Sequence, residues 1–230
     1  MYRGDMTALI LAQMGGSDCE TIGSGVLAQP VNAISSLAYA VVGLFVLAWA
    51  LRVAGTERIV RVVFGLLMIA TGTGSVMFHG TQGPASQFSH DITFLVTVWF
   101  LAVLNVAEAY GSKRWVGWSA FGAGAGVLAV SLALYPGITN VLMVGVVVAL
   151  VGADIALHRR GRIRSGWYVG ALVAVITAVA MFILGRTGGL VCDPGSIFQG
   201  HALWHLLSAA ALGAYFVATS DVRVRAILEG

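Results

Sequence analysis

The sequence predicts an all-α integral membrane protein, a single bundle of seven transmembrane helices. Three observations support this fold class. Only 10% of the 230 residues are charged, whereas soluble domains have roughly 25%. The mean hydropathy of the chain is +0.89. Apolar runs of about 20 residues, the length that a hydrocarbon core of about 30 Å requires, recur seven times.

Short interruptions rich in Gly, Pro, Arg and Ser separate these runs, without a soluble domain or an internal repeat. We therefore treat residues 1–230 as one domain with an exoplasmic N-terminal segment, 1–29. The start of the chain does not have the pattern of a signal peptide, because its apolar run is short and Asp5 stands where basic residues are expected. The spans are expected at about 30–52, 59–79, 89–109, 115–134, 138–157, 167–185 and 198–218.

The positions of Lys and Arg predict the orientation, since cytoplasmic loops are enriched in both. Only Arg3 and Arg186 fall on one side of the predicted topology. The other side holds the remaining eleven: Arg52, Arg58, Arg61, Lys113, Arg114, Arg159, Arg160, Arg162, Arg164, Arg223 and Arg225. This bias predicts an exoplasmic N-terminus and a cytoplasmic C-terminus. Because the basic residues are confined to short loops and the tail, the net charge of +3 does not indicate a nucleic-acid partner.

Three histidines suggest a metal site. His79 ends the second span, and His201 and His205 share one face of the seventh at i, i+4 spacing. An ionisable side chain inside a bilayer is costly and is by default a candidate functional residue. On the predicted topology all three lie in the exoplasmic part of the bundle. Three neutral imidazoles with a fourth position open for water form the ligand set of a catalytic zinc site.

Two further polar residues fall at the same depth. Ser75 precedes His79 by one helical turn, and Asp91 lies at the start of the third span. Zinc supplies a Lewis acid and an activated water, Asp91 can act as general base and acid, and Ser75 can stabilise an oxyanion or orient the water. The set suits hydrolysis of an amide or ester within the membrane. Taken alone, Ser75 is equally a small packing residue beside Gly72 and Gly74.

Three other residues are singled out by their position. Cys19 and Cys192 both fall on the exoplasmic side, where disulfides persist. A bridge would join the N-terminal segment to the loop before the last span; the alternative is two free thiols. Asn32 is polar at membrane depth, so it either bonds to a neighbouring helix or orients a zinc-binding histidine from its outer side.

An ordered set of motifs resembles that of the alkaline ceramidases: Ser75-x-x-Phe78-His79, then Asp91, then His201-x-x-Trp204-His205. These enzymes belong to a superfamily of seven-span metal-dependent hydrolases that also includes the adiponectin and progestin receptors. Two further pieces resemble the first motif of the family: Asp18-Cys19-Glu20 and Asn32-x-x-Ser35. The resemblance therefore covers nearly the whole chain.

The resemblance implies a zinc-dependent amidohydrolase that cleaves the N-acyl bond of ceramide. It implies that zinc is held by His79, His201 and His205, that Ser75 and Asp91 serve catalysis, and that a disulfide joins Cys19 to Cys192. An Ala-, Gly- and Val-rich composition with a single lysine is typical of a GC-rich bacterial genome. We therefore expect a bacterial member in the inner membrane, with its site toward the exoplasmic side. Many bacteria lack sphingolipids, so another N-acyl lipid remains open as the substrate.

The sequence departs from the family in two places. The eukaryotic ceramidases carry an acidic calcium site in the N-terminal segment. Here Asp18 and Glu20 remain, but 21–29 has no carboxylate and Gln29 stands where the family has an acid. Calcium takes six to eight oxygens, which argues against a calcium site here. The stretch from the first ligand to Asp91 is also about one residue longer, so a contribution of His90 stays open.

The alternative function is a heptahelical lipid-binding or receptor-like protein in which zinc is structural. Lipid binding without hydrolysis, or a site closed by a fourth protein ligand, would favour it. A retinal protein is excluded, because a Schiff base needs a lysine in the seventh span and the only lysine, Lys113, lies in a loop. The sequence implies a membrane lipid as the substrate and no protein partner.

Overall fold

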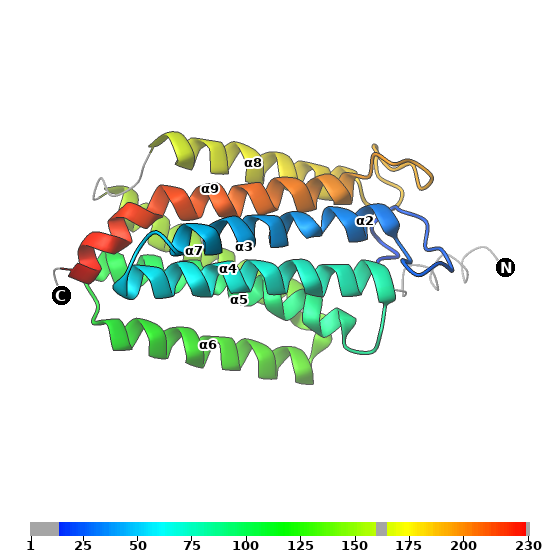
Figure 1. Cartoon of the computed structure of the whole chain (residues 1–230). Helices are drawn as coiled ribbons and strands as arrows, with labels where there is room; N and C mark the ends of the chain where they lie inside the picture. Colours follow the sequence, from blue (N-terminus) through cyan, green and yellow to red (C-terminus); the bar gives the residue numbers. More distant parts are fainter. Residues whose placement is uncertain (1–13, 160–164, 229–230) are drawn as a thin grey trace.

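The computed structural model describes residues 14–159 and 165–228, whose helices form one elongated bundle (Figure 1). Within these residues, seven helical stretches are long and apolar enough to cross a membrane. No strand occurs in the described ranges. The predicted all-helical, seven-span fold class is therefore confirmed. Arg3, Asp5 and the arginines at 160, 162 and 164 lie outside the described residues, so the structure does not bear on that part of the orientation argument.

The spans are built from eight α-helices, because the first span is divided in two. Short turns of other helix types extend two spans: the π-helical turn η1 (Met77–Thr81) follows α4, and the 3-10 turn η2 (Pro136–Ile138) precedes α7. The α-helices, labelled as in Figure 1, are α2 (Pro30–Ser35), α3 (Leu37–Ala50), α4 (Gly55–Val76), α5 (Ser86–Tyr110), α6 (Arg114–Leu134), α7 (Thr139–Arg159), α8 (Ser165–Leu184) and α9 (Gly200–Leu228).

Most observed spans match the predicted ones to within a few residues at each end. The largest difference is in the seventh span, where α9 continues to Leu228 rather than ending at 218. The second span begins at Gly55 rather than at 59. The predicted span begins after Glu57 and Arg58, but the helix includes both. Arg61 is buried, pairs with Glu57 one turn away, and places its guanidinium carbon 3.5 Å from the ring centre of Trp49. The helix therefore continues through a charged turn.

The break between α2 and α3 lies at Ser36. The hydroxyls of Ser35 and Ser36 both donate to the carbonyl oxygen of Asn32, at 2.9 and 2.7 Å. Serine side chains that bond back to the preceding turn bend helices, because they compete for the backbone acceptor. The break therefore has a local cause, and it leaves both hydroxyls directed toward α9, where they lie near His205.

Close helix packing depends on glycine at two crossings. A Cβ at Gly43 of α3 would lie 2.5 Å from the carbonyl oxygen of Gly65 in α4, and a Cβ at Gly185 would lie 2.6 Å from the Cα of Gly200. Small residues allow such approaches between membrane helices. The second crossing holds the start of α9 against the end of α8, which fixes the position of His201.

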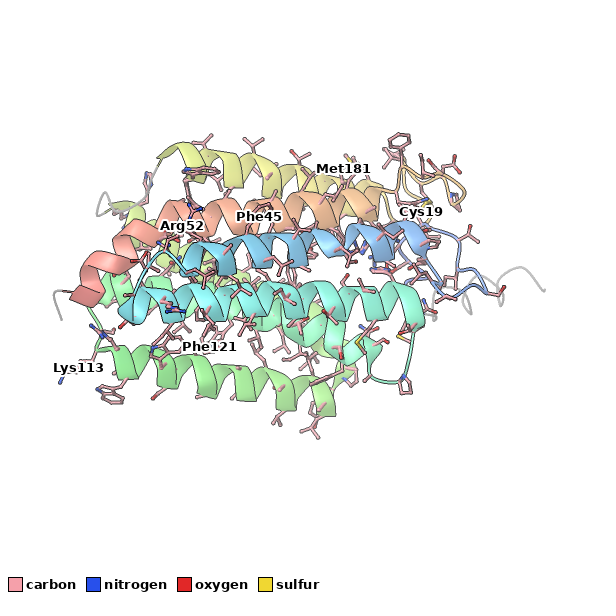
Figure 2. All side chains as sticks on the ribbon, viewed as in Figure 1. Cys19, Phe45, Arg52, Lys113, Phe121 and Met181 are labelled. Atoms are coloured by element: carbon pink, nitrogen blue, oxygen red, sulfur yellow. A yellow bond between two sulfur atoms is a disulfide. The ribbon has the colours of Figure 1, made fainter. Side chains whose placement is uncertain are left out.

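The remaining helices pack around α3, α4, α5 and α9. α7 packs against α5, α8 packs against α9, and α6 lies along α5 at the edge of the bundle (Figure 1). Large apolar side chains cover the outside; Phe45, which Figure 2 labels, is 72% exposed. An apolar outer surface of this kind is expected where helices face lipid. Many polar residues of the bundle, including His79, His201 and His205, are buried.

Candidate metal centre

His79, His201 and His205 lie together at the end of the bundle that carries the N-terminal segment. One nitrogen from each ring can be chosen so that all three lie within 4.8 Å of one another. All three side chains are buried. The ring centres are 4.6–5.0 Å apart. Residues more than a hundred positions apart in sequence thus present imidazoles to one small space.

Local structure explains how each ring reaches this space. His79 stands in the π-helical turn η1, and such turns occur frequently at functional sites. The turn ends at Gln82, whose left-handed φ of 50° reverses the chain. His201 and His205 occupy the first two turns of α9, so they project from one face of that helix.

Nδ1 of each ring, which we call the outer nitrogen, faces a polar group from residues 18–36. Nε2 is the inner nitrogen. In each case Nδ1 is the nearer atom: Gln29 Oε1 lies 2.8 Å from that of His79, Asp18 Oδ1 lies 3.4 Å from that of His201, and Ser35 Oγ lies 3.0 Å from that of His205. The approach of His201 to Asp18 is not a hydrogen bond, since Nδ1 of His201 has no hydrogen-bond partner in the described residues. Nδ1 of His79 and of His205 have the kind of partner that metal-binding histidines usually have on the nitrogen that does not bind the metal.

The inner nitrogens are largely unpaired. Within the described residues, Nε2 of His79 and Nε2 of His201 have no hydrogen-bond partner, although both are buried. Nε2 of His205 has only Ser75 Oγ, at 3.4 Å. A buried polar atom without a partner costs about 1–3 kcal/mol. Converging imidazole nitrogens are donors that zinc and neighbouring transition metals accept, so the residues present fit a metal ion.

Ser75 and Asn32 lie against this centre. Ser75 is buried, and its hydroxyl shares a hydrogen bond of 2.8 Å with Ser36 Oγ. The side-chain amide of Asn32 is also buried, and in the described part of the chain neither of its polar atoms has a hydrogen-bond partner. The structure therefore gives no helix-to-helix hydrogen bond that would account for Asn32.

Asp91 lies beside the centre rather than in it. Its carboxylate accepts hydrogen bonds from Gln87 Nε2 at 2.7 Å and from Thr139 Oγ1 at 2.8 Å, and it faces Nδ1 of His90 at 2.8 Å. The His90 ring is 5.9 Å from the ring of His79. Among the described residues, neither Asp91 nor His90 belongs to the group whose ligand atoms converge. His90 thus contacts both the carboxylate and a candidate ligand.

The family model for ceramidases matches residues 19–229. The chain belongs to the ceramidase family. The resemblance found in the motifs is confirmed at that level, and it covers nearly the whole chain. The family acts on lipid amides, so membership supports a lipid amide hydrolase, and the three histidines are positions that can hold a metal ion. No curated protein matches the chain.

The two N-terminal acids of this ceramidase-family member have partners within the protein. Both carboxylate oxygens of Glu20 accept backbone N–H groups at the start of α2, from Val31 at 2.7 Å and Asn32 at 2.8 Å. Asp18 pairs with Arg186 at 2.7 Å. Burial raises the pKa of the Asp18 carboxyl, and the Arg186 guanidinium opposes that rise.

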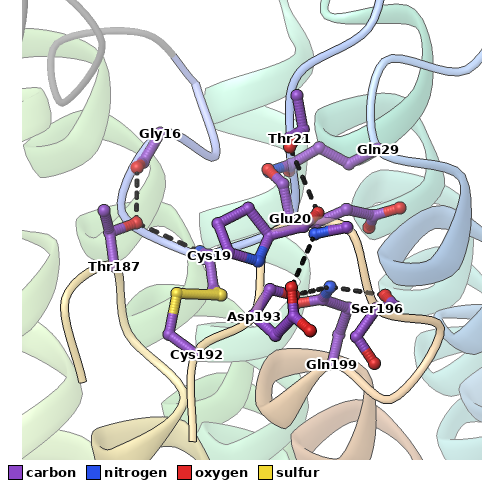
Figure 3. Close-up of a disulfide and its surroundings, with 12 residues drawn as sticks. Gly16, Cys19, Glu20, Thr21, Gln29, Thr187, Cys192, Asp193, Ser196 and Gln199 are labelled. Carbon is purple, nitrogen blue, oxygen red and sulfur yellow. Dashed lines mark hydrogen bonds between the residues drawn. A yellow bond between two sulfur atoms is a disulfide. The ribbon is translucent and has the colours of Figure 1, made fainter. Parts of the chain in front are cut away.

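The predicted disulfide between Cys19 and Cys192 is confirmed (Figure 3). It joins positions 173 residues apart and holds the N-terminal segment to the loop before α9. Hydrogen bonds reinforce the junction: Cys19 N donates to Thr187 Oγ1 at 3.1 Å, and Thr187 N donates to the carbonyl oxygen of Ser17 at 3.0 Å. The segment that faces the outer sides of the histidines is therefore fixed at both ends.

Two residues near the centre have no role predicted from the sequence. Gln29 enters the prediction only as a departure from an acidic motif, yet it is fully buried against His79. The available signal is a polar amide directly before the proline that begins the first span. Trp204 enters only as part of a motif; its ring lies 5.2 Å from that of Phe182 and 6.0 Å from that of Phe94, so it packs between helices.

Proposed function

We propose that this protein is a zinc-dependent intramembrane hydrolase that cleaves the amide bond of ceramide or of another N-acyl lipid. The observation that carries the proposal is the group of three buried histidines with converging inner nitrogens, two of them without a hydrogen-bond partner in the described residues, in a chain of the ceramidase family. Three imidazoles and an open fourth position match catalytic rather than structural zinc sites. Bound zinc supplies a Lewis acid and a water that is nucleophilic at neutral pH.

The chemistry is hydrolysis of a carboxamide. Water adds to the carbonyl carbon, the C–N bond breaks, and the nitrogen leaves as an amine with a proton. We assign Asp91 the transfer of that proton from the attacking water to the leaving amine. Hydrogen bonds from Gln87 and Thr139 orient its carboxylate, and the His90 ring contacts both this carboxylate and His79.

Ser75 is assigned to the oxygen side of the reaction. Its hydroxyl lies 3.4 Å from the inner nitrogen of His205 and forms a hydrogen bond of 2.8 Å with Ser36 Oγ. Because Ser36 Oγ donates to Asn32, the Ser75 hydroxyl is the donor toward Ser36. In the reaction this O–H would turn from Ser36 to the oxyanion that develops on the carbonyl oxygen. Its position one turn before His79 supports the role, because the two side chains share a face of the second span.

A lipid substrate suits the surroundings of the centre. The seven spans expose apolar side chains to the bilayer, so a lipid can reach the bundle without passing through water. The aromatic ring of Phe182 lies 5.7 Å from that of His201, and the ring of Trp204 lies 5.2 Å from that of Phe182. Apolar walls with a few placed polar groups are typical of small-molecule sites.

The predicted orientation belongs to the same proposal. Arg52 and Lys113 lie at the end of the bundle opposite to Cys19 (Figure 2), which is the distribution that the positive-inside rule associates with a cytoplasmic end. We therefore place the centre on the exoplasmic side of a bacterial inner membrane. A disulfide at the same end supports this side, since disulfides persist outside the cytoplasm.

The test combines metal analysis of the purified protein with a screen of lipid amides. We expect one zinc per chain and release of fatty acid from ceramide or another N-acyl lipid, with both lost in His205→Ala. Purified protein that binds no metal, or binds lipid amides without cleaving them at any metal load, would overturn the proposal. The second result would favour a receptor-like role.

A further inference from the structure

The side chain of Gln29 has a single compatible orientation. It is fully buried, and its Nε2 lies 2.9 Å from the carbonyl oxygen of Gly15 and 2.9 Å from that of Glu20. Both neighbours are acceptors, so the NH₂ group must face them. A flipped amide would set its oxygen against two carbonyl oxygens. Oε1 is therefore directed toward His79, whose Nδ1 lies 2.8 Å away.

This orientation determines where His79 carries its proton. An amide oxygen only accepts hydrogen bonds, so Nδ1 of His79 must donate. A neutral imidazole has one N–H, which leaves the lone pair on Nε2. That atom is buried and has no hydrogen-bond partner in the described residues. Nε2 of His79 is thus free to bind a metal, whereas Nδ1 is engaged in the hydrogen bond to Gln29.

We propose that Gln29 is a positioning residue of the metal centre, which fixes the tautomer and direction of His79 and couples this ligand to the N-terminal segment. The inference rests on the proposed function, because it requires a metal at the three histidines. Partners of this kind change metal affinity by about 10- to 100-fold when they are removed. Gln29 itself touches neither the metal nor the substrate in this role.

The backbone strengthens the same connection. Gln29 N donates to the carbonyl oxygen of His79 at 2.8 Å, and Ala28 N donates to that of Gly80 at 3.0 Å. On its other side the amide is confined by Gly15, whose φ is +74° and whose Cβ, if it had one, would lie 2.1 Å from Gln29 Oε1. The N-terminal segment is therefore built around this amide.

The chain offers a matched control in Gln199. This glutamine is also buried, and its Nε2 also donates to two loop carbonyls, of Asp193 at 2.9 Å and Ser196 at 2.6 Å. Its Oε1, unlike that of Gln29, has no hydrogen-bond partner in the described part of the chain. Gln29→Met and Gln199→Met therefore each remove two hydrogen bonds to loop carbonyls, but only the first removes an acceptor from a candidate ligand.

The experiment measures the zinc dissociation constant of the full chain in detergent by competition with a chelator. We expect Gln29→Met to weaken zinc binding by about 10- to 100-fold and Gln199→Met to leave it within about threefold. Gln29→Glu separates the two functions of the amide, because its carboxyl group accepts from His79 but does not reproduce both donors. It should bind zinc as tightly as the wild type or more tightly, although its thermal stability falls.

Each outcome is decisive. Equal zinc affinity in Gln29→Met and Gln199→Met would overturn the role of Gln29 and leave the proposed function standing. An equal loss in Gln29→Glu and Gln29→Met would also overturn it, because acceptance from His79 would then be irrelevant. A wild-type protein that binds no zinc would overturn both proposals. Imidazole ¹⁵N shifts of the metal-free protein give a second readout: His79 should be protonated on Nδ1 in the wild type and in Gln29→Glu, and mixed in Gln29→Met.

Discussion

The two ends of the bundle both bury polar side chains, but they satisfy them differently. At the end far from the disulfide, Asp154 accepts hydrogen bonds from the hydroxyls of Tyr168 and Tyr215, and Tyr215 is in turn bonded by Asn105. At the histidine end, imidazole nitrogens and the amide of Asn32 have no partner among the described residues.

The comparison shows that burial of polar groups does not by itself identify a site. A network whose members satisfy one another links helices and needs no ligand. Groups that are held on their outer sides and unpaired on their inner sides leave a cost of about 1–3 kcal/mol per atom unless a ligand meets them. The second arrangement is the one expected of a preformed metal centre.

The largest expected effect comes from removing a ligand at the histidine end. His205→Ala should abolish zinc binding and reduce lipid-amide hydrolysis to the background rate, because two imidazoles do not hold the ion in an open catalytic geometry. The matched variant is His158→Ala, at the other end, where the ring stacks against Tyr168 with centres 6.0 Å apart. It should keep the wild-type zinc content and rate. Metal analysis and fatty-acid release measure both. Loss of zinc in His158→Ala would show that the two ends are not independent.

Asp91→Asn should give the next largest effect. The amide retains the shape of the carboxylate but cannot accept and return a proton, so the rate of hydrolysis should fall by about 10²- to 10⁴-fold. Zinc content should stay at the wild-type level, since Asp91 is outside the group of converging ligands. Kinetics with the lipid substrate and metal analysis of the same preparation separate the two quantities. A parallel loss of zinc would make Asp91 a ligand instead.

Most of the fold follows from the sequence, because hydrophobic length and basic loops are strong signals in membrane proteins. The seven spans are present, and the disulfide partners are the ones that the family resemblance implied. The ends of the spans were less predictable. The charged residues Glu57 and Arg58 limit the apolar run in the sequence, but the helix begins before them, and Glu57 pairs with Arg61 one turn later.

The histidines and Ser75 were accessible to sequence reasoning because i, i+4 spacing places them on defined helix faces. The contacts of Gln29 and Asp91 were not. Gln29 reaches His79 across 50 residues through a loop whose path depends on Gly15 and the disulfide. Asp91 is held by Thr139 from another span, and the side of α5 on which it is bonded follows from helix packing rather than from local periodicity.

Removal of the disulfide should have a smaller effect, confined to the histidine end. The double variant Cys19→Ser, Cys192→Ser should lower the stability of the protein by about 2–4 kcal/mol, since the bridge closes a long loop. Amide hydrogen exchange should rise in residues 14–36 and in the loop before α9, and should not change around Asp154. Increased exchange across both ends would mean that the bundle unfolds as one unit and that the N-terminal segment is not a separable support.

The smallest expected effect is at the end of the bundle that holds the Asp154 network. Asp154→Asn should lower stability without affecting activity, the opposite of what is expected for Asp91→Asn. Asp154→Asn leaves one acceptor oxygen in place of two, so the hydrogen bond to this side chain from either Tyr168 or Tyr215 is lost. Hydrogen bonds between membrane helices contribute about 0.5–2 kcal/mol, which corresponds to a fall of a few degrees in the unfolding temperature. Zinc content and hydrolysis rate should be unchanged. The same substitution would then cost activity at one end and only stability at the other. A rate loss in Asp154→Asn that exceeds its loss of folded protein would contradict the separation, because it would couple a paired network to the metal centre across the length of the bundle.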